Sequence, residues 1–196
     1  IVHHLLENSN DKYDVFNLSL SHCRDCHFIF LTNPINPKYF YTNYFTLSSW
    51  KDQSHATKII DIINLNQNLA KKDPILEIGC NDAHFLSSLK ENGFKNLKGI
   101  EPSQDAYNLA INKGFDVDHD FFNSNSKIIL ENKTKYKIII TRHVLEHIID
   151  LEDFISSIND VLDDDGVLIV EVPDFDSYLE NFDYTLWEEH VNCFTL

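Results

Sequence analysis

The feature that most constrains this chain is a regular alternation of short apolar runs with helix-length segments between residues 74 and 173. Five apolar runs begin near positions 74, 96, 115, 135 and 166, and amphipathic or glycine-ended segments separate most of them. Neighbouring strands joined by helices require crossover connections, which make the strands parallel. The pattern therefore predicts an α/β fold with a doubly wound, mainly parallel sheet.

The alternation is preceded by two segments of different character. Residues 57–70 space isoleucines and leucines as an amphipathic helix does, which predicts a helix there. Residues 1–45 hold a cysteine pair, many aromatics and little periodicity. We therefore expect a small, partial zinc-ribbon-like and substrate-lining segment over 1–45 and a ligand-binding domain over 55–196. The chain has no methionine, even at position 1, so we expect a piece of a longer protein that is truncated at both ends.

Composition excludes several classes of protein. The 196 residues carry a formal charge of −15, which repels phosphate backbones and argues against a nucleic-acid partner. No apolar run is long enough to span a membrane, and no leader-like segment is present, so we expect no membrane partner. Four cysteines form no disulfide framework, which favours a reducing, cytoplasmic location. The sequence leaves the oligomeric state open.

The stretch "DPILEIGCNDAHFL", residues 73–86, predicts a strand, a sharp turn and a helix. Gly79 lies at the turn, where the missing Cβ lets a ligand approach the backbone. Glu101 ends the next strand, at about the distance along the chain where an acid binds ribose hydroxyls in open α/β sheets. These two positions predict a ligand that contains adenosine.

The glycine pattern narrows the choice of ligand. A dinucleotide site requires G-x-G-x-x-G, and the corresponding residues are Gly79, Asn81 and His84. Two glycines are therefore missing, which argues against an NAD-dependent oxidoreductase. The segment "LEIGCNDAHFL" instead resembles the first motif of class I S-adenosylmethionine (SAM) methyltransferases, which have a Rossmann-like fold. Ala83 replaces the last glycine of that motif.

This resemblance implies a set of cofactor-binding residues. Glu77 would order the loop and the amino group of SAM, Glu101 would hold the ribose, and the pair after the third strand would lie near adenine. "TRHVLEH", residues 141–147, resembles the fourth-strand motif of the family. The expected cofactor-binding residues are Glu77, Gly79, Asn81, Glu101, Asp120, Phe121 and Arg142.

The cysteine pair "CRDC", Cys23 and Cys26, has the spacing of a zinc knuckle but supplies only half of a tetrahedral site. The surrounding segment resembles the second half of a small zinc-binding domain found in a family of sugar C-methyltransferases. In that family an earlier C-x-x-C completes the site, and here it would precede residue 1. The resemblance implies zinc in the full-length protein; two free cysteines in a loop remain the alternative.

The segment "WEEHVNCFT", residues 187–195, resembles the Y-x-E-H-x-x-Y-F-S segment of the same sugar methyltransferases, with Trp187 and Cys193 as departures. The resemblance implies His190 as base with Glu189 beside it, and His147 as a second histidine near the substrate. The stretch "YFYTNYFTLSSW" resembles the family's substrate-lining segment. The expected substrate residues are Tyr41, Tyr44 and Ser48.

Together these features predict a methyltransferase that acts on a small molecule, with a nucleotide-linked keto-deoxysugar as the acceptor. A base would remove a proton next to the ketone, and the enolate carbon would attack the methyl of SAM. Histidine suits this role because its pKa lies near neutral. Methyl transfer to oxygen or nitrogen of another small molecule, and a non-catalytic scaffold with the same fold, remain alternatives.

Overall fold

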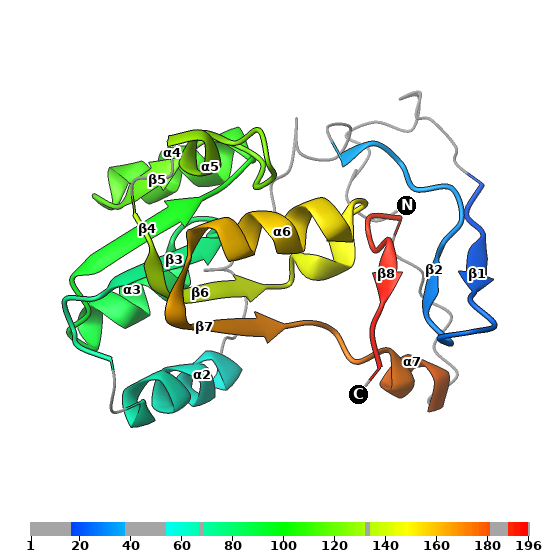
Figure 1. The fold of residues 1–196 in the computed structure, drawn as a ribbon, viewed down its shortest axis with the longest axis horizontal. Coiled ribbons are helices and arrows are strands. Elements are labelled where there is room, and N and C mark those ends of the chain that lie inside the picture. The colour runs from blue at the N-terminus through cyan, green and yellow to red at the C-terminus, as the bar shows by residue number, and fades with distance from the viewer. Residues whose placement is uncertain (1–16, 38–53, 67–68, 132–133, 181–187, 196) are drawn as a thin grey trace, which may run out of the picture.

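The computed structural model describes residues 17–37, 54–66, 69–131, 134–180 and 188–195. The described chain forms a five-stranded sheet of order β5-β4-β3-β6-β7 and a three-stranded sheet of order β1-β2-β8. Figure 1 shows the larger sheet between helices and the smaller sheet beside its β6–β7 end. The predicted α/β fold with a doubly wound parallel sheet is confirmed.

All strands of the large sheet are parallel. They are β3 (Pro74–Ile78), β4 (Asn96–Ile100), β5 (Asp116–Asp118), β6 (Tyr136–Arg142) and β7 (Leu162–Glu171). From β3 the chain builds β4 and β5 on one side and then returns to build β6 and β7 on the other. The loops after β3 and β6 therefore diverge, which opens a crevice at the carboxyl ends of the strands.

Two apolar clusters cover the two faces of this sheet. One packs α2 (Ser54–Leu65), α3 (His84–Glu91) and α4 (Gln104–Asn112) on residues such as Ile75. The other packs α5 (Lys127–Glu131) and α6 (Leu151–Val161) on residues such as Leu76. Successive strand residues point to opposite faces, so both faces of the sheet must be apolar.

Most helix and strand boundaries agree with the expected ones to within a few residues. The helix expected over 57–70 begins at Ser54 and ends at Leu65. Gly93 follows α3 with φ of 90°, as expected of a glycine that ends a helix. Ser103 is the residue that caps α4, but its side chain makes no capping hydrogen bond.

The small sheet joins distant parts of the chain. β1 (Leu20–His22) and β2 (Ile29–Leu31) form an antiparallel hairpin, and β2 also pairs with β8 (Asn192–Cys193). The predicted segment 1–45 therefore shares a sheet with a strand of the predicted domain 55–196. The short helix α7 (Phe175–Glu180) follows β7, and the Phe175 N–H donates to the Phe194 carbonyl near β8.

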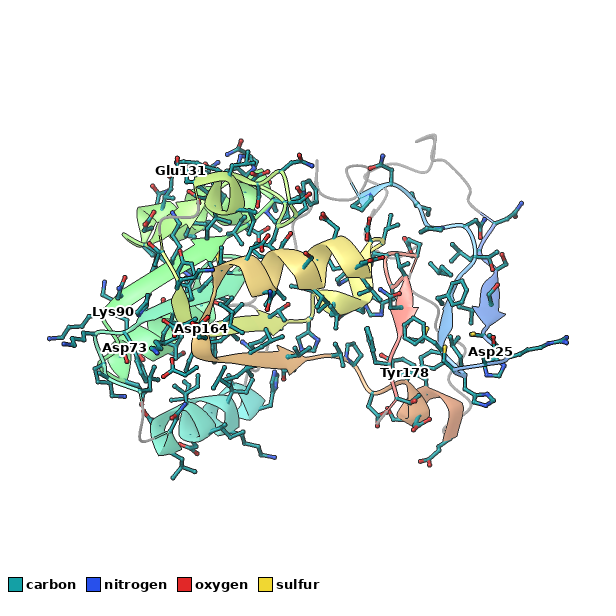
Figure 2. The ribbon with its side chains drawn as sticks, in the orientation of Figure 1. Asp25, Asp73, Lys90, Glu131, Asp164 and Tyr178 are labelled. Carbon is teal, nitrogen blue, oxygen red and sulfur yellow. The ribbon has the colours of Figure 1, made fainter. Side chains whose placement is uncertain are left out.

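The outside of the molecule is charged. Asp25, Lys90, Glu131 and Asp164, labelled in Figure 2, are all exposed. Among the described residues, no helix has the length and apolar character needed to cross a bilayer.

Candidate active site

A pocket of about 390 Å³ lies at the carboxyl ends of β3, β4 and β6 and under the loop that follows β5. This is the crevice that the strand order predicts. Its lining includes five of the residues expected to bind the cofactor, namely Gly79, Asn81, Glu101, Asp120 and Phe121. It also includes His147 of the expected catalytic set. A pocket of this volume is in the range of small-molecule sites.

Gly79 is required at the turn after β3 for two reasons. Its φ is 69°, a left-handed conformation that costs little only for glycine. A Cβ built on Gly79 would lie 2.4 Å from Cγ2 of Val144, which follows β6. The Gly79 N–H donates to the Ile100 carbonyl at 2.9 Å, so the turn is tied to the end of β4. The ends of β3 and β4 therefore meet at a position that has no side chain.

The same turn holds two further left-handed residues, Asn81 with φ of 51° and Ala83 with φ of 58°. Ala83 is the residue that replaces the last glycine of the methyltransferase motif, and its conformation is the one that a glycine there would adopt easily. The loop thus keeps the path of the glycine motif although one glycine has been lost.

Glu101 connects this turn to the pocket. Its carboxylate accepts the Asn81 N–H at 2.8 Å and the Ser103 N–H at 2.7 Å. Burial raises the pKa of Glu101 to about 7, although the two backbone hydrogen bonds act in the opposite direction. A carboxylate fixed in this way at a strand end is a suitable acceptor for the hydroxyl pair of a ribose.

Glu77 lies inside the sheet rather than on the pocket wall. Its side chain is buried, and one carboxylate oxygen has no hydrogen-bond partner. Burial raises the pKa of Glu77 to about 8; Arg142 lowers it, while Glu101 raises it further. The ionised form of Glu77 is therefore disfavoured in the folded chain, because the loss of hydration outweighs the attraction of Arg142.

Asp120 and Phe121 lie on the pocket wall after β5. The Asp120 carboxylate accepts the N–H of Phe121 at 2.9 Å and that of Lys127 at 3.3 Å. Asp120 thereby shapes the loop that forms one side of the pocket.

Arg142 does not line the pocket. Its Nε donates to Glu171 at 2.6 Å, one Nη lies 3.1 Å from Nε2 of His55, and its guanidinium stacks over Phe85. The guanidinium therefore holds the end of β6 to β7 and α2.

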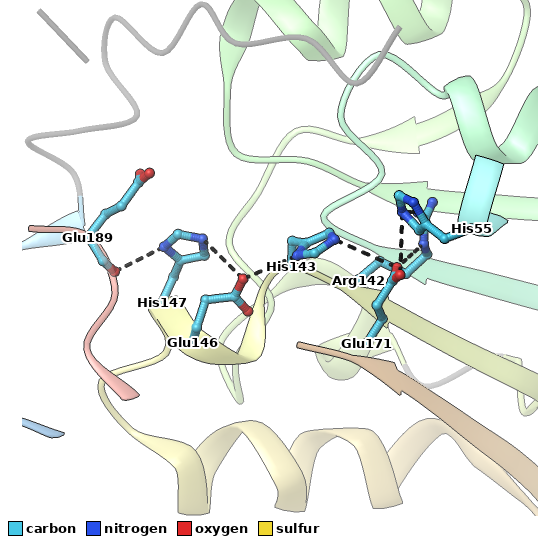
Figure 3. A network of polar contacts seen from close by, with 7 residues as sticks. All are labelled: His55, Arg142, His143, Glu146, His147, Glu171 and Glu189. Atoms are coloured by element: carbon cyan, nitrogen blue, oxygen red, sulfur yellow. Dashed lines mark hydrogen bonds and ion pairs between the residues drawn. The ribbon is translucent and has the colours of Figure 1, made fainter. Parts of the chain in front are cut away.

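The expected catalytic residues His147, Glu189 and His190 contact one another, and Figure 3 shows the backbone contact between His147 and Glu189. The Nδ1 of His147 donates to the Glu189 carbonyl at 2.9 Å, and the rings of His147 and His190 meet edge to face at 4.9 Å. Burial, with the neighbouring His147 as a second cause, lowers the pKa of His190 to about 4, so His190 is neutral at pH 7. His147 reaches the pocket wall, whereas His190 is not among the lining residues.

The cysteine pair lies in the turn of the β1–β2 hairpin. Hydrogen bonds from the backbone of Cys26 and Asp25, and then from the Cys26 side chain, lower the pKa of Cys23, which favours the thiolate that binds zinc. In the described chain, however, no third ligand atom joins these two sulfurs in a compact group. Zinc binding by Cys23 and Cys26 stays a prediction.

The expected substrate residues, Tyr41, Tyr44 and Ser48, lie outside the described residues. Sequence reasoning missed Val144, His143 and Glu146, although "HVLEH" places acid and imidazole one helical turn apart. It also missed Gly99, where a Cβ would lie 2.5 Å from Sγ of Cys80.

Comparison with known proteins decides the family. A family model described as "Methyltransferase domain" matches residues 50–196. The chain belongs to this methyltransferase domain family.

A curated relative of the chain is the tRNA U34 carboxymethyltransferase of Helicobacter pylori (strain HPAG1), 31% identical over 67 residues, which are 34% of this chain and 24% of that protein. Two similar solved structures share the fold. A SAM-dependent methyltransferase from Clostridium acetobutylicum ATCC 824 has a TM-score of 0.52 and 22% identity, over 65% of this chain and 53% of that one. The plantazolicin methyltransferase BpumL, solved with a desmethylPZN analog and SAH, has a TM-score of 0.55 and 17% identity, over 69% and 52%. The chain thus spans about a quarter of the curated relative and half of these structures.

Proposed function

We propose that this chain is the catalytic part of a SAM-dependent methyltransferase that methylates a carbon of a small carbonyl compound, with a nucleotide-linked keto-deoxysugar as the acceptor. The observation that carries the cofactor assignment is the joint geometry of Gly79 and Glu101 in one pocket. The glycine lets the residues after β6 close on the turn that would contact the cofactor, and Glu101 lies in the same pocket at the strand end where an acid would bind the ribose.

The acceptor side of the proposal rests on the cluster that contains His147, Glu189 and His190 and on the resemblance of residues 187–195 to sugar C-methyltransferases. An imidazole that lines the pocket, His143 or His147, takes a proton from the carbon next to the ketone. The enolate carbon then forms a bond to the methyl of SAM while the carbon–sulfur bond breaks, and S-adenosylhomocysteine (SAH) leaves as a neutral thioether. Alignment of the enolate, methyl and sulfur supplies much of the rate.

One observation favours a second candidate. The described lining of the pocket contains four carboxylates (Glu101, Asp120, Asp150 and Asp153) and no lysine or arginine. Such a wall disfavours a phosphate close to the reacting carbon. Transfer to oxygen or nitrogen of an uncharged or cationic small molecule is therefore the alternative.

Calorimetry with SAH tests the cofactor assignment. We expect micromolar binding by the chain and a loss of at least about tenfold in Glu101→Gln, because the amide cannot accept from both backbone N–H groups and the ribose. Glu152→Gln, the same change on the exposed side of α6, is the control and should bind normally. Millimolar binding by the unchanged chain would instead support the scaffold alternative.

Incubation with methyl-labelled SAM and a nucleotide-linked keto-sugar tests the acceptor. Label on carbon supports the proposal, whereas label on oxygen or nitrogen replaces it by the alternative.

A further inference from the structure

We infer that Glu146, His147 and His190 bind a divalent transition-metal ion beside the pocket, and that zinc suits these donors best. One carboxylate and two imidazoles are the protein ligands of several catalytic zinc sites, which keep a further position open for water or substrate. The role of the ion in catalysis rests on the proposed function; its binding does not.

The positions of the ligand atoms fit one ion. One atom from each of the three residues lies within 4.8 Å of the others, and Nε2 of His147 lies 3.9 Å from Oε1 of Glu146. This separation is too long for a hydrogen bond. Two ligand atoms on a tetrahedral zinc ion are about 3.4 Å apart. A shift of about half an ångström therefore brings the atoms of Glu146 and His147 to the separation of zinc ligands, and the ligand atom of His190 lies within 4.8 Å of both.

His147 is already held in the orientation of a metal ligand. Its Nδ1 must carry the proton, because the Glu189 carbonyl that it contacts at 2.9 Å can only accept. In the neutral ring the lone pair is then on Nε2, which faces Glu146 (Figure 3). A hydrogen bond from the second ring nitrogen to a backbone carbonyl is the usual support of a metal-bound histidine.

Glu146 supplies an independent indication. Its side chain is 1% exposed, and neither carboxylate oxygen has a hydrogen-bond partner. In the part of the chain that the structure describes, its ion pairs are with His143 and His147 only, at 3.6 and 3.9 Å. A buried carboxylate without hydrogen bonds is costly unless a cation lies beside it.

A second cluster of carboxylate and imidazole groups in the same molecule shows how a cation of the protein can offset the cost of burying a carboxylate. His55, His143 and Glu171 form another compact group of possible ligands. There the guanidinium of Arg142 lies 2.6 Å from Glu171 and 3.1 Å from His55, so the cation is part of the protein. Figure 3 shows Arg142 at Glu171, with His143 between Glu171 and Glu146. The two clusters thus offer similar donors, and among the described residues a lysine or arginine forms an ion pair only with the carboxylate of the Glu171 cluster.

The backbone around Glu146 is well fixed, as a metal site requires. Glu146 and His147 belong to the 3₁₀ turn η2 (Leu145–His147). The Val191 N–H donates to the Glu146 carbonyl at 2.6 Å, and the Asn192 amide donates to the Leu145 and Ile148 carbonyls. These hydrogen bonds hold Val191, the residue after His190, directly against the turn η2.

The location beside the pocket gives the ion a role in the proposed reaction. An ion at this wall would polarise the carbonyl oxygen of the acceptor and make the neighbouring proton more acidic. With His147 and His190 occupied as ligands, the proton passes to His143, which lines the same pocket and is not one of the three ligands.

The test measures metal binding directly. The chain is prepared with Cys23→Ser and Cys26→Ser, so that the cysteine pair cannot bind zinc, and all metal is removed with a chelator. Zinc is then titrated in competition with a chromophoric chelator, and cobalt(II) is added separately to record its visible absorption. We expect one ion per chain and a cobalt spectrum typical of nitrogen and oxygen ligands.

Matched variants locate the site. Glu146→Gln and His147→Gln should each weaken zinc binding by more than about tenfold, since even changes next to a metal ligand often have that effect. Glu171→Gln and His55→Gln, in the Arg142 cluster, should leave it within about twofold, because they do not touch the ligands. Thermal unfolding and SAH binding establish that each variant is folded.

Three results would separate the possibilities. No stoichiometric zinc binding, or equal affinity in folded Glu146→Gln and His147→Gln, overturns the site whether or not SAH binds. Zinc binding that depends on both residues, without methyl transfer to any keto-sugar, supports the site while the proposed acceptor fails. Retained zinc and SAH binding in His143→Gln, with loss of turnover, supports the assigned path of the proton.

Discussion

The turn at Gly79 leads to a prediction whose size follows from the structure. In Gly79→Ala the new Cβ would lie 2.4 Å from Cγ2 of Val144, and the residue would keep a φ of 69°. The left-handed backbone costs about 1–2 kcal/mol for alanine. Forcing a methyl group into a filled space costs about 1–3 kcal/mol more, and the stiffer unfolded chain returns about 0.4–1 kcal/mol. We expect Gly79→Ala to lower the free energy of unfolding by about 2–4 kcal/mol.

Two further variants separate these contributions. Val144→Ala removes the clashing methyl groups, and the remaining Cβ of residue 144 lies 3.8 Å from the new atom, an ordinary contact. In this background Gly79→Ala should cost only about 1 kcal/mol, which leaves a coupling energy of about 1–3 kcal/mol. Gly114→Ala is the matched control, because its φ is 82° and nothing lies within 4 Å of its added Cβ. It should also cost about 1 kcal/mol.

Urea unfolding followed by circular dichroism measures the unchanged chain, the three single variants and the double variant, and SAH calorimetry on the same samples reports the pocket. Equal costs at positions 79 and 114, with no coupling to residue 144, would show that the turn has room for a side chain. The close approach of the two strand ends, on which the cofactor site depends, would then be refuted.

Three other predictions follow from buried polar groups. Asn192→Ala should destabilise the chain by about 1–3 kcal/mol, measured by urea unfolding, since it leaves two carbonyls of the turn beside Glu146 without their donor. Burial raises the pKa of Glu77 from 4.5 to about 8, so the folded chain binds this proton more tightly than the unfolded chain, and its stability should fall as the pH rises through this window. In Glu77→Gln the stability should fall less steeply between pH 4.5 and 8, because the contribution of Glu77 is missing while that of Glu101 stays, and an unchanged slope would contradict the assignment. The pKa of Glu101 is about 7, and hydroxyl groups that donate to it favour the ionised form; SAH binding at pH 7 should therefore release protons and strengthen as the pH rises. Calorimetry in two buffers with different ionisation enthalpies should give different heats, and identical heats would argue against Glu101 as the ribose ligand.

The main sheet could be predicted because parallel strands that are buried on both faces appear in the sequence as continuous apolar runs. The strand expected at 74–79 is β3, and the one expected at 96–101 is β4. The strands of the small sheet were missed because each is only two or three residues long. A segment of that length has no measurable period.

Part of the candidate site could likewise be predicted from the sequence, and part of it could not. Gly79 and Glu101 could be paired from the sequence because the ends of neighbouring parallel strands must meet. The contact between His147 and Glu189 joins residues 42 positions apart through a loop, which no local pattern records. Arg142 was expected at the cofactor from its motif, but its side chain is engaged by Glu171 and His55 instead.

The backbone hydrogen bonds of Val191 connect the N-terminal hairpin to the residues of the proposed metal site. The Leu31 N–H of β2 donates to the Val191 carbonyl at 2.8 Å, and the Val191 N–H donates to the Glu146 carbonyl at 2.6 Å. One peptide segment therefore connects the hairpin that carries Cys23 and Cys26 to the turn that carries Glu146 and His147. Because a backbone segment held on both sides has little freedom, these hydrogen bonds restrict the backbone next to His190. The cysteine hairpin is thus tied to the turn of Glu146 and His147 even though it lies outside the main sheet.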